Sequence, residues 1–108
     1  MDSLKKTRDF QNVYRRGRSY ANRLLVMYVL ENGLPSNRVG ISVSKKVGNS
    51  VVRHRLTRLV RENYRLREEM FHSGWDIVVV ARVSAKESDF HEIGSALTHL
   101  AGLHRILK

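Results

Sequence analysis

The stretch from 40 to 67 constrains the fold most, because a strand pattern passes there directly into a helix pattern. Branched apolar residues alternate with Gly40, Ser42 and Ser44, which is the period-two pattern of a strand. After Gly48 the apolar residues recur every three or four positions, as in an amphipathic helix. A sheet covered by at least one helix is therefore expected. The strand face made of glycine and serine leaves room for a helix or a ligand close to the backbone.

The rest of the chain supplies further elements. Thr7 is the expected N-cap of a first helix that Gly17 ends, and the turn with Gly33 and Pro35 is expected to join two strands as a hairpin. The predicted order is helix, strand, strand, helix, strand, helix, at 8–16, 22–31, 38–44, 50–70, 75–83 and 87–107. This order predicts the α+β class, as an α/β sandwich with one small mixed sheet. At 108 residues the chain is expected to be one domain, 1–108.

The charge is large and uneven. The 20 Lys and Arg against 10 Asp and Glu leave a net charge of +10. Residues 1–23 carry seven basic and two acidic residues, 45–67 carry eight basic residues and one acid, and 68–108 carry four basic and six acidic. A small basic protein of this kind usually binds polyanions, of which nucleic acid is the commonest. The binding surface is expected in the first two-thirds of the chain.

The helix that starts near Asn49 or Ser50 breaks a local rule. The positive end of a helix dipole favours acids by about 0.3–1 kcal/mol each, yet Arg53 and Arg55 lie near this end and no acid precedes Glu62. Such an end can bind a phosphate through backbone N–H and guanidinium groups. A merely solvated face would carry mixed charges paired at i and i+4, which are scarce here. Phosphate binding is therefore the preferred interpretation.

The two faces of this helix differ. One stripe is expected to pack on the sheet, and it consists of Val52, Leu56, Leu59, Asn63, Leu66 and Met70. Arg58, Arg61 and Arg65 fall on the opposite face. In the first helix, Phe10, Val13 and Tyr14 share one face, and this spacing alone favours a role in the core.

Several classes of protein are disfavoured. The chain has no cysteine, so disulfides and thiolate metal sites are excluded, and no apolar run reaches the roughly 18 residues of a membrane span. The five histidines include no pair at helical metal-site spacing, and neither a P-loop nor a nucleophile elbow is present. The expectation is therefore a protein without catalytic residues or metal ligands of its own.

Three motifs carry a family resemblance. SKKVGNSVVRHRLTRLVRE at 44–62, DFQNVYRRGRSYANR at 9–23 and DIVVVAR at 76–82 together resemble the protein component of bacterial ribonuclease P. The resemblance implies a left-handed crossover between parallel strands. It also implies an accessory subunit, because in that family a catalytic RNA with Mg²⁺ at its active site removes the 5′ leader of precursor tRNA. The implied partners are the catalytic RNA and precursor tRNA in a 1:1 cytoplasmic complex, with no membrane contact and no cofactor bound by the protein alone.

The resemblance and the patterns together nominate two groups of residues. Contacts with RNA are expected from Lys45, Lys46, Arg53, His54, Arg55, Arg58, Arg61 and Arg65. A cleft for the single-stranded leader is expected from Phe10, Tyr14, Tyr28, Ser42 and Ser44. Because aromatic rings stack bases in single-strand sites, the resemblance favours some exposure of Phe10 or Tyr14, in contrast to their spacing.

The chain departs from the family pattern at three positions. His54 stands where the motif has asparagine, Thr57 replaces a commonly basic residue, and His104 stands where some relatives have an aromatic residue. Two other interpretations remain open: a ribosomal or chaperone-type RNA-binding protein, and an autonomous nuclease that uses histidine.

Overall fold

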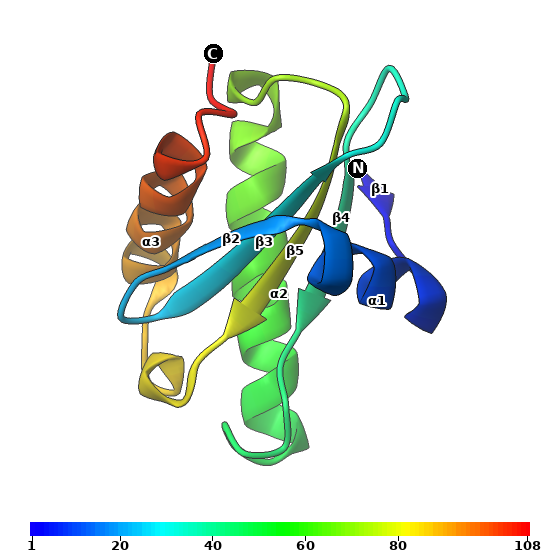
Figure 1. Cartoon of the computed structure of the whole chain (residues 1–108). Coiled ribbons are helices and arrows are strands. Elements are labelled where there is room, and N and C mark those ends of the chain that lie inside the picture. Colours follow the sequence, from blue (N-terminus) through cyan, green and yellow to red (C-terminus); the bar gives the residue numbers. More distant parts are fainter.

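The computed structural model describes residues 1–108 as five strands, three α-helices and two short 3₁₀ turns (Figure 1). The 3₁₀ turns lie at Glu68–Met70 and Val83–Ala85. The main elements, in chain order, are β1 (Asp2–Ser3), α1 (Thr7–Arg16), β2 (Arg18–Ala21), β3 (Leu25–Glu31), β4 (Arg38–Ser42), α2 (Ser50–Arg67), β5 (Trp75–Ala81) and α3 (Phe90–Leu103).

The strands form one mixed sheet in the order β1-β4-β5-β3-β2. β4 pairs parallel with β5 and with β1, whereas the remaining pairs are antiparallel. The predicted α+β class and mixed sheet are therefore confirmed. The expected hairpin between β3 and β4 is wrong, because Val78 of β5 pairs with Tyr28 on one side and with Gly40 on the other. β5 is apolar on both faces, and a strand of that kind is buried best at the centre of a sheet.

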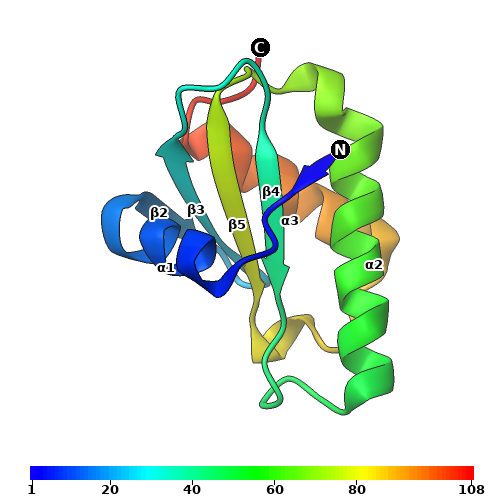
Figure 2. The ribbon, with the colours of Figure 1, turned by 90° about the vertical axis from the view of Figure 1, so that its right-hand side faces the viewer.

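The connection from β4 through α2 to β5 is left-handed. β4 and β5 run in the same direction, α2 lies on the rear face of the sheet, and β5 lies to the left of β4 when both strands point downward (Figure 1). The side view confirms that α2 lies on the face opposite α1 (Figure 2). About 98% of such crossovers are right-handed, so this connection is a distinctive feature, as the family resemblance implies.

The sheet is covered on both faces, α1 on one and α2 with α3 on the other (Figure 2). The larger core lies beneath α2 and α3 and includes Met27, Ile77 and Val79. Under α1 lies a smaller cluster in which Val13 and Val78 are fully buried. Successive strand residues therefore supply opposite cores, as the strand period requires.

α2 is rotated relative to the predicted stripe. Leu66 and Met70 are 65% and 49% exposed, whereas Val60 and Tyr64 are buried. The helix packs against α3 as well as against the sheet, which moves the buried face toward the 60–64 side. Asn63 is buried in this contact, where its Nδ2 donates to the backbone oxygens of Leu59 and Phe90 at 2.9 and 3.1 Å.

The ends of the elements differ from the sequence expectations in detail. Asn49 caps α2, since its side-chain oxygen accepts from the Val52 N–H at 3.1 Å. Thr7 is the first residue of α1 rather than its cap, and Lys6 at the cap position provides no side-chain bond. α3 begins at Phe90 after a capping box between Asp89 and Glu92. The short edge strands β1 and β2 were not predicted, because neither has an alternating apolar pattern and β2 is exposed throughout.

Candidate nucleic-acid interface

The outer face of α2 carries an arginine-lined hollow of about 640 Å³. It is lined by Ser50, Val51, His54, Arg55, Arg58 and Arg61. The single ion pair of the molecule joins Arg38 to Asp76 elsewhere, so no carboxylate neutralises the guanidinium groups of this hollow. Four of the predicted RNA-binding residues therefore lie together on one uncompensated cationic surface.

Arg55 differs from its neighbours, because its side chain is used inside the protein. Its Nη1 donates to the carbonyl of Ser88 at 2.8 Å and its Nη2 to the carbonyl of Lys86 at 2.5 Å. Both acceptors belong to the loop between β5 and α3. Arg55 thus holds that loop against the N-terminal part of α2, a role that sequence spacing could not reveal.

The other predicted basic residues lie around the hollow rather than in it. Lys45 and Lys46 are exposed in the turn before α2, and Arg65 is exposed farther along the helix. Arg53 is half-buried, and its Nε is enclosed without a hydrogen-bond partner. Arg67, which was not predicted to bind RNA, donates to the Asn63 side chain at 2.7 Å. The basic surface is therefore centred on His54, Arg58 and Arg61.

A second hollow, of about 570 Å³, lies between α1 and β4. It is lined by Lys5, Thr7, Phe10, Gln11, Tyr14, Ile41 and Ser42. Gly40 makes the close approach of α1 possible, because a Cβ at this position would lie 2.5 Å from Cζ of Phe10. The prediction that small residues on this strand face leave room above the sheet is confirmed at Gly40 and Ser42.

The aromatic residues form a connected series over this face. Tyr14 is 38% exposed, and its ring meets Tyr28 edge-on at 4.9 Å and Phe10 at 6.5 Å between centroids. Tyr28 is half-buried and supports Tyr14 without lining the hollow itself, and Ser44 is exposed outside it. The structure thus brings Phe10, Tyr14 and Ser42 together, with Tyr28 behind them.

Sequence reasoning missed three polar residues of this cleft, Lys5, Thr7 and Gln11, as well as the apolar Ile41. Thr7, Gln11 and Tyr14 stand at i, i+4 and i+7 of one helix, so they share a face. A search for polar residues aligned with an exposed aromatic residue would have found two of the three. Together they add hydrogen-bonding groups and one cation to an aromatic wall.

Elsewhere the polar groups are largely committed to the fold. Nε and Nη2 of Arg38 donate to Asp76 at 2.8 and 2.6 Å, and this hydrogen bonding raises the pKa of Arg38. Burial raises the pKa of Tyr64, whose hydroxyl accepts from Asn37 at 3.4 Å.

No cluster of three or more potential metal ligands occurs in the structure. None of the helices has the length and hydrophobicity needed to cross a bilayer.

The sequence and the fold of the whole chain can be compared with those of known proteins. The Ribonuclease P family matches residues 1–104 of this chain. The ribonuclease P protein component of Lachnoclostridium phytofermentans is 59% identical over 98% of this chain and 91% of its own length. Among solved structures, the RNase P protein of Staphylococcus aureus superposes with a TM-score of 0.92 at 37% identity, over 100% of this chain and 99% of its own.

The protein from Thermotoga maritima gives a TM-score of 0.87 at 31% identity, with full coverage of both chains. Sequence and fold thus agree over essentially the whole length of the chain. The chain belongs to the ribonuclease P protein family, and it is a protein subunit of the ribonucleoprotein endoribonuclease that processes the 5′ leader of precursor tRNA.

Proposed function

We propose that the chain binds two RNAs, one on each side of its sheet. The α1–β4 cleft holds the single-stranded leader, and the outer face of α2 contacts the catalytic RNA. The observation that carries this proposal is the separation of one aromatic, polar hollow from one guanidinium-lined hollow. Membership of the family implies both partners, the ribonuclease P RNA and precursor tRNA.

The cleft suits a flexible strand of varied sequence. Tyr14 exposes a ring on which a base can stack, with Phe10 beside it, and such stacking is worth about 1–3 kcal/mol per base. Lys5 at the edge of the cleft can pair with a phosphate, while Gln11 and Ser42 can donate to or accept from the strand. Most of this binding energy does not depend on base identity.

On the α2 face, the cations reduce repulsion between RNA phosphates. The free side chains of Arg58 and Arg61 can each form forked hydrogen bonds with phosphate oxygens. Mg²⁺ belongs, in this proposal, to the active site of the catalytic RNA, and the protein binds no cofactor by itself. The chain acts as one RNA-binding domain, as a monomer in a 1:1 complex in the cytoplasm.

Reconstitution tests the function directly. A bacterial ribonuclease P RNA is mixed with precursor tRNA at low Mg²⁺, with and without this protein. We expect faster cleavage when the protein is present, because its cations substitute for part of the Mg²⁺ that screens the phosphates. Unchanged cleavage would refute the assignment of the two surfaces. Cleavage by the protein without any RNA subunit would instead favour an autonomous nuclease.

A substrate comparison tests the cleft. Tyr14→Ala is expected to weaken binding of precursor tRNA with a leader by roughly 5- to 100-fold, the equivalent of one stacked base. Binding of mature tRNA, which has no leader, should not change. Equal losses for both substrates would place the leader elsewhere. Tyr20→Ala is a matched control, since Tyr20 is 45% exposed on β2 and lies outside the cleft.

A further inference from the structure

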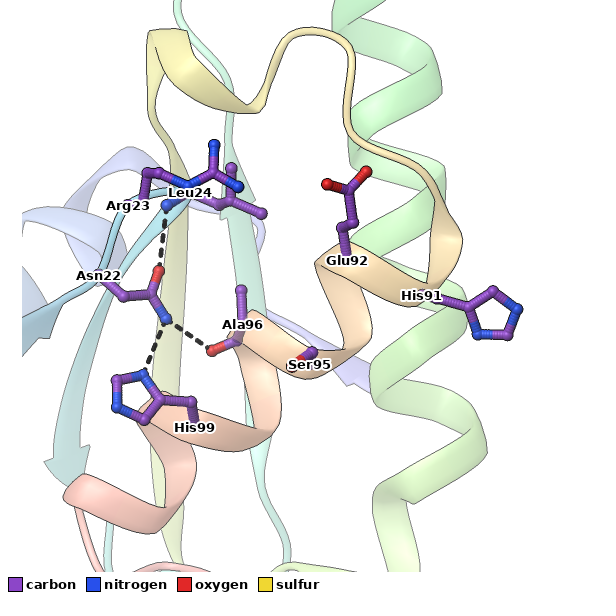
Figure 3. A pocket seen from close by; sticks show the side chains of 8 residues that line it. All are labelled: Asn22, Arg23, Leu24, His91, Glu92, Ser95, Ala96 and His99. Atoms are coloured by element: carbon purple, nitrogen blue, oxygen red, sulfur yellow. Dashed lines mark hydrogen bonds between the residues drawn. The ribbon is translucent and has the colours of Figure 1, made fainter.

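A third hollow, of about 450 Å³, lies between the segment 22–24 and α3 and belongs to neither proposed RNA surface (Figure 3). Its floor is apolar, formed by Leu24 and Ala96, which are 5% and 9% exposed. Its walls are polar and include Arg23, Glu92 and His99. The volume lies within the range of small-molecule sites, roughly 300–1,000 Å³.

One wall is held rigidly by Asn22. Its Oδ1 accepts from the backbone N–H groups of Leu24 and Leu25 at 3.2 and 3.0 Å, and its Nδ2 donates to the Ala96 carbonyl at 3.0 Å. The same Nδ2 lies 3.1 Å from Nδ1 of His99. Because this amide nitrogen can only donate, Nδ1 of a neutral His99 is the acceptor and the ring proton lies on Nε2. This contact fixes the orientation of the His99 ring beside the hollow.

The backbone of the segment is anchored as well. Nη1 of Arg82 donates to the Asn22 carbonyl at 2.8 Å, and the Ser84 hydroxyl donates to the Arg23 carbonyl. The backbone N–H of Arg82 donates to the Leu24 carbonyl at 2.9 Å. The wall that carries Arg23 is thus formed before any ligand arrives, which reduces the entropy cost of binding.

The charged groups of the hollow are not paired with each other. Figure 3 shows the Arg23 guanidinium and the Glu92 carboxylate on facing sides of the hollow, while His91 points away from it. No ion pair involves Arg23. One Glu92 oxygen accepts from the Asp89 N–H in the capping box, which leaves the second oxygen free as an acceptor. A ligand here would meet the Arg23 cation on one side and the Glu92 carboxylate on the other, with His99 at the end of the hollow beyond Asn22.

We propose that this hollow binds one ribonucleotide. The phosphate pairs with Arg23, the ribose hydroxyls donate to the free oxygen of Glu92, and the base lies on Leu24 and Ala96, on the side of the hollow lined by the His99 ring. A carboxylate beside an anion site favours a ligand that also has hydroxyl donors, and the 2′-hydroxyl is the group that distinguishes RNA from DNA. Inorganic phosphate has neither a ribose nor a base, so it cannot pair with Arg23 and also cover the apolar floor.

Nucleotide titration followed by NMR tests the site in the full chain. We expect adenosine 5′-monophosphate to shift the His99 ring signals saturably, and to bind at least threefold more tightly than its 2′-deoxy form or inorganic phosphate. Arg23→Gln should weaken binding at least fivefold, whereas Arg16→Gln on α1 should not, although it removes the same charge. Unmoved His99 signals, equal affinity for inorganic phosphate, or equal effects of the two variants would overturn the proposal.

The source of the nucleotide is distinguished by a second ligand. If a short oligoadenylate binds more tightly than the mononucleotide and loses affinity in Arg23→Gln, the hollow takes one unit of an RNA strand. If only the mononucleotide binds, the ligand is a free nucleotide. Tyr14→Ala separates this site from the leader cleft, because it should leave the His99 shifts unchanged even if the cleft proposal fails.

Discussion

The arginines of α2 have different roles although the sequence presents them as one series. Arg58 and Arg61 are exposed in the hollow, whereas Arg55 donates two hydrogen bonds to the β5–α3 loop. Hydrogen bonds from a charged donor are worth about 1.5–3 kcal/mol when fully formed, and exposure reduces this value. Arg55 is therefore expected to contribute mainly to the stability of the protein. Its effect on RNA binding should be indirect, through the loop that it holds.

Salt dependence separates these roles. If about four cations of α2 contact phosphates, log affinity for the catalytic RNA should fall with log salt at a slope near −3, using about 0.7 per contact. Arg58→Gln should make the slope shallower by about 0.7 and leave the melting temperature unchanged. Arg55→Gln should lower the free energy of unfolding by about 1–3 kcal/mol and keep the slope. The reverse pattern would show that Arg55 contacts the RNA directly.

His104 is the residue whose titration should affect folding. It is 2% exposed, its Nε2 lies 2.8 Å from the Met27 carbonyl, and its Nδ1 has no partner. Burial is the main cause that lowers its pKa. The unfolded chain therefore binds this proton more readily than the folded one, and the free energy of unfolding should fall as pH drops below about 6.5.

Denaturation at about pH 7.5 and about pH 5.5 measures this effect. In His104→Phe, which keeps a ring against Tyr20, the loss of stability on acidification should be smaller than in the parent chain. His72→Gln is the control, because it removes an exposed histidine instead of a buried one. An unchanged pH dependence in His104→Phe would mean that another group is responsible.

At the scale of elements, the contact between α2 and α3 depends on a glycine. A Cβ at Gly94 would lie 2.4 Å from Oδ1 of Asn63 and 3.0 Å from Nη2 of Arg67. The helices are therefore as close as the absence of a side chain allows. The position of α3 in turn fixes the hollow next to Arg23.

Two glycines of the same helix provide a matched test. Gly94→Ala should destabilise the protein by about 1–3 kcal/mol, because the added methyl group pushes Asn63 from its hydrogen bonds or separates the helices. Gly102→Ala, at a position with nothing within 4 Å, should be neutral or stabilising by up to about 1 kcal/mol. Urea denaturation of both variants gives the comparison, and similar values would show that the close contact is easily relieved.

At the scale of the whole molecule, the sheet separates the two proposed RNA surfaces. α1 and its cleft lie on one face, and α2 lies on the other (Figure 2). No residue is shared between the two hollows. The surfaces should therefore act independently within the complex.

A double variant tests this independence. The affinity of the complex with catalytic RNA for precursor tRNA is measured for Tyr14→Ala, for Arg58→Gln and for the double variant. The losses in binding free energy of the two single variants should add up to that of the double variant within about 0.5 kcal/mol. Binding of the catalytic RNA alone should be weakened by Arg58→Gln and not by Tyr14→Ala. A coupling well above 0.5 kcal/mol would mean that one RNA bridges both faces or that the sheet transmits a change.

The sequence by itself determined the class of the fold and the segments that carry the basic residues. Three features depend only on residues close together in the sequence. They are the strand pattern around Gly40, the capping residue Asn49 and the lack of acids in the first turn of α2. The motifs also identified the family, and the comparisons confirm it. Of the residues that the sequence suggests for the cleft, Phe10, Tyr14 and Ser42 line one hollow.

Only the tertiary structure decided which partners these residues meet. The insertion of β5 between β3 and β4, the rotation of α2 and the commitment of Arg55 to two carbonyls all depend on segments far apart in the sequence. A helix pattern gives the spacing of side chains but not the neighbouring element that covers them. Because α2 also packs against α3, Tyr64 is buried on this helix, and Leu66, which the pattern placed in the core, is exposed. Packing between distant elements thus divided one run of arginines into residues that hold the fold and residues left free for RNA.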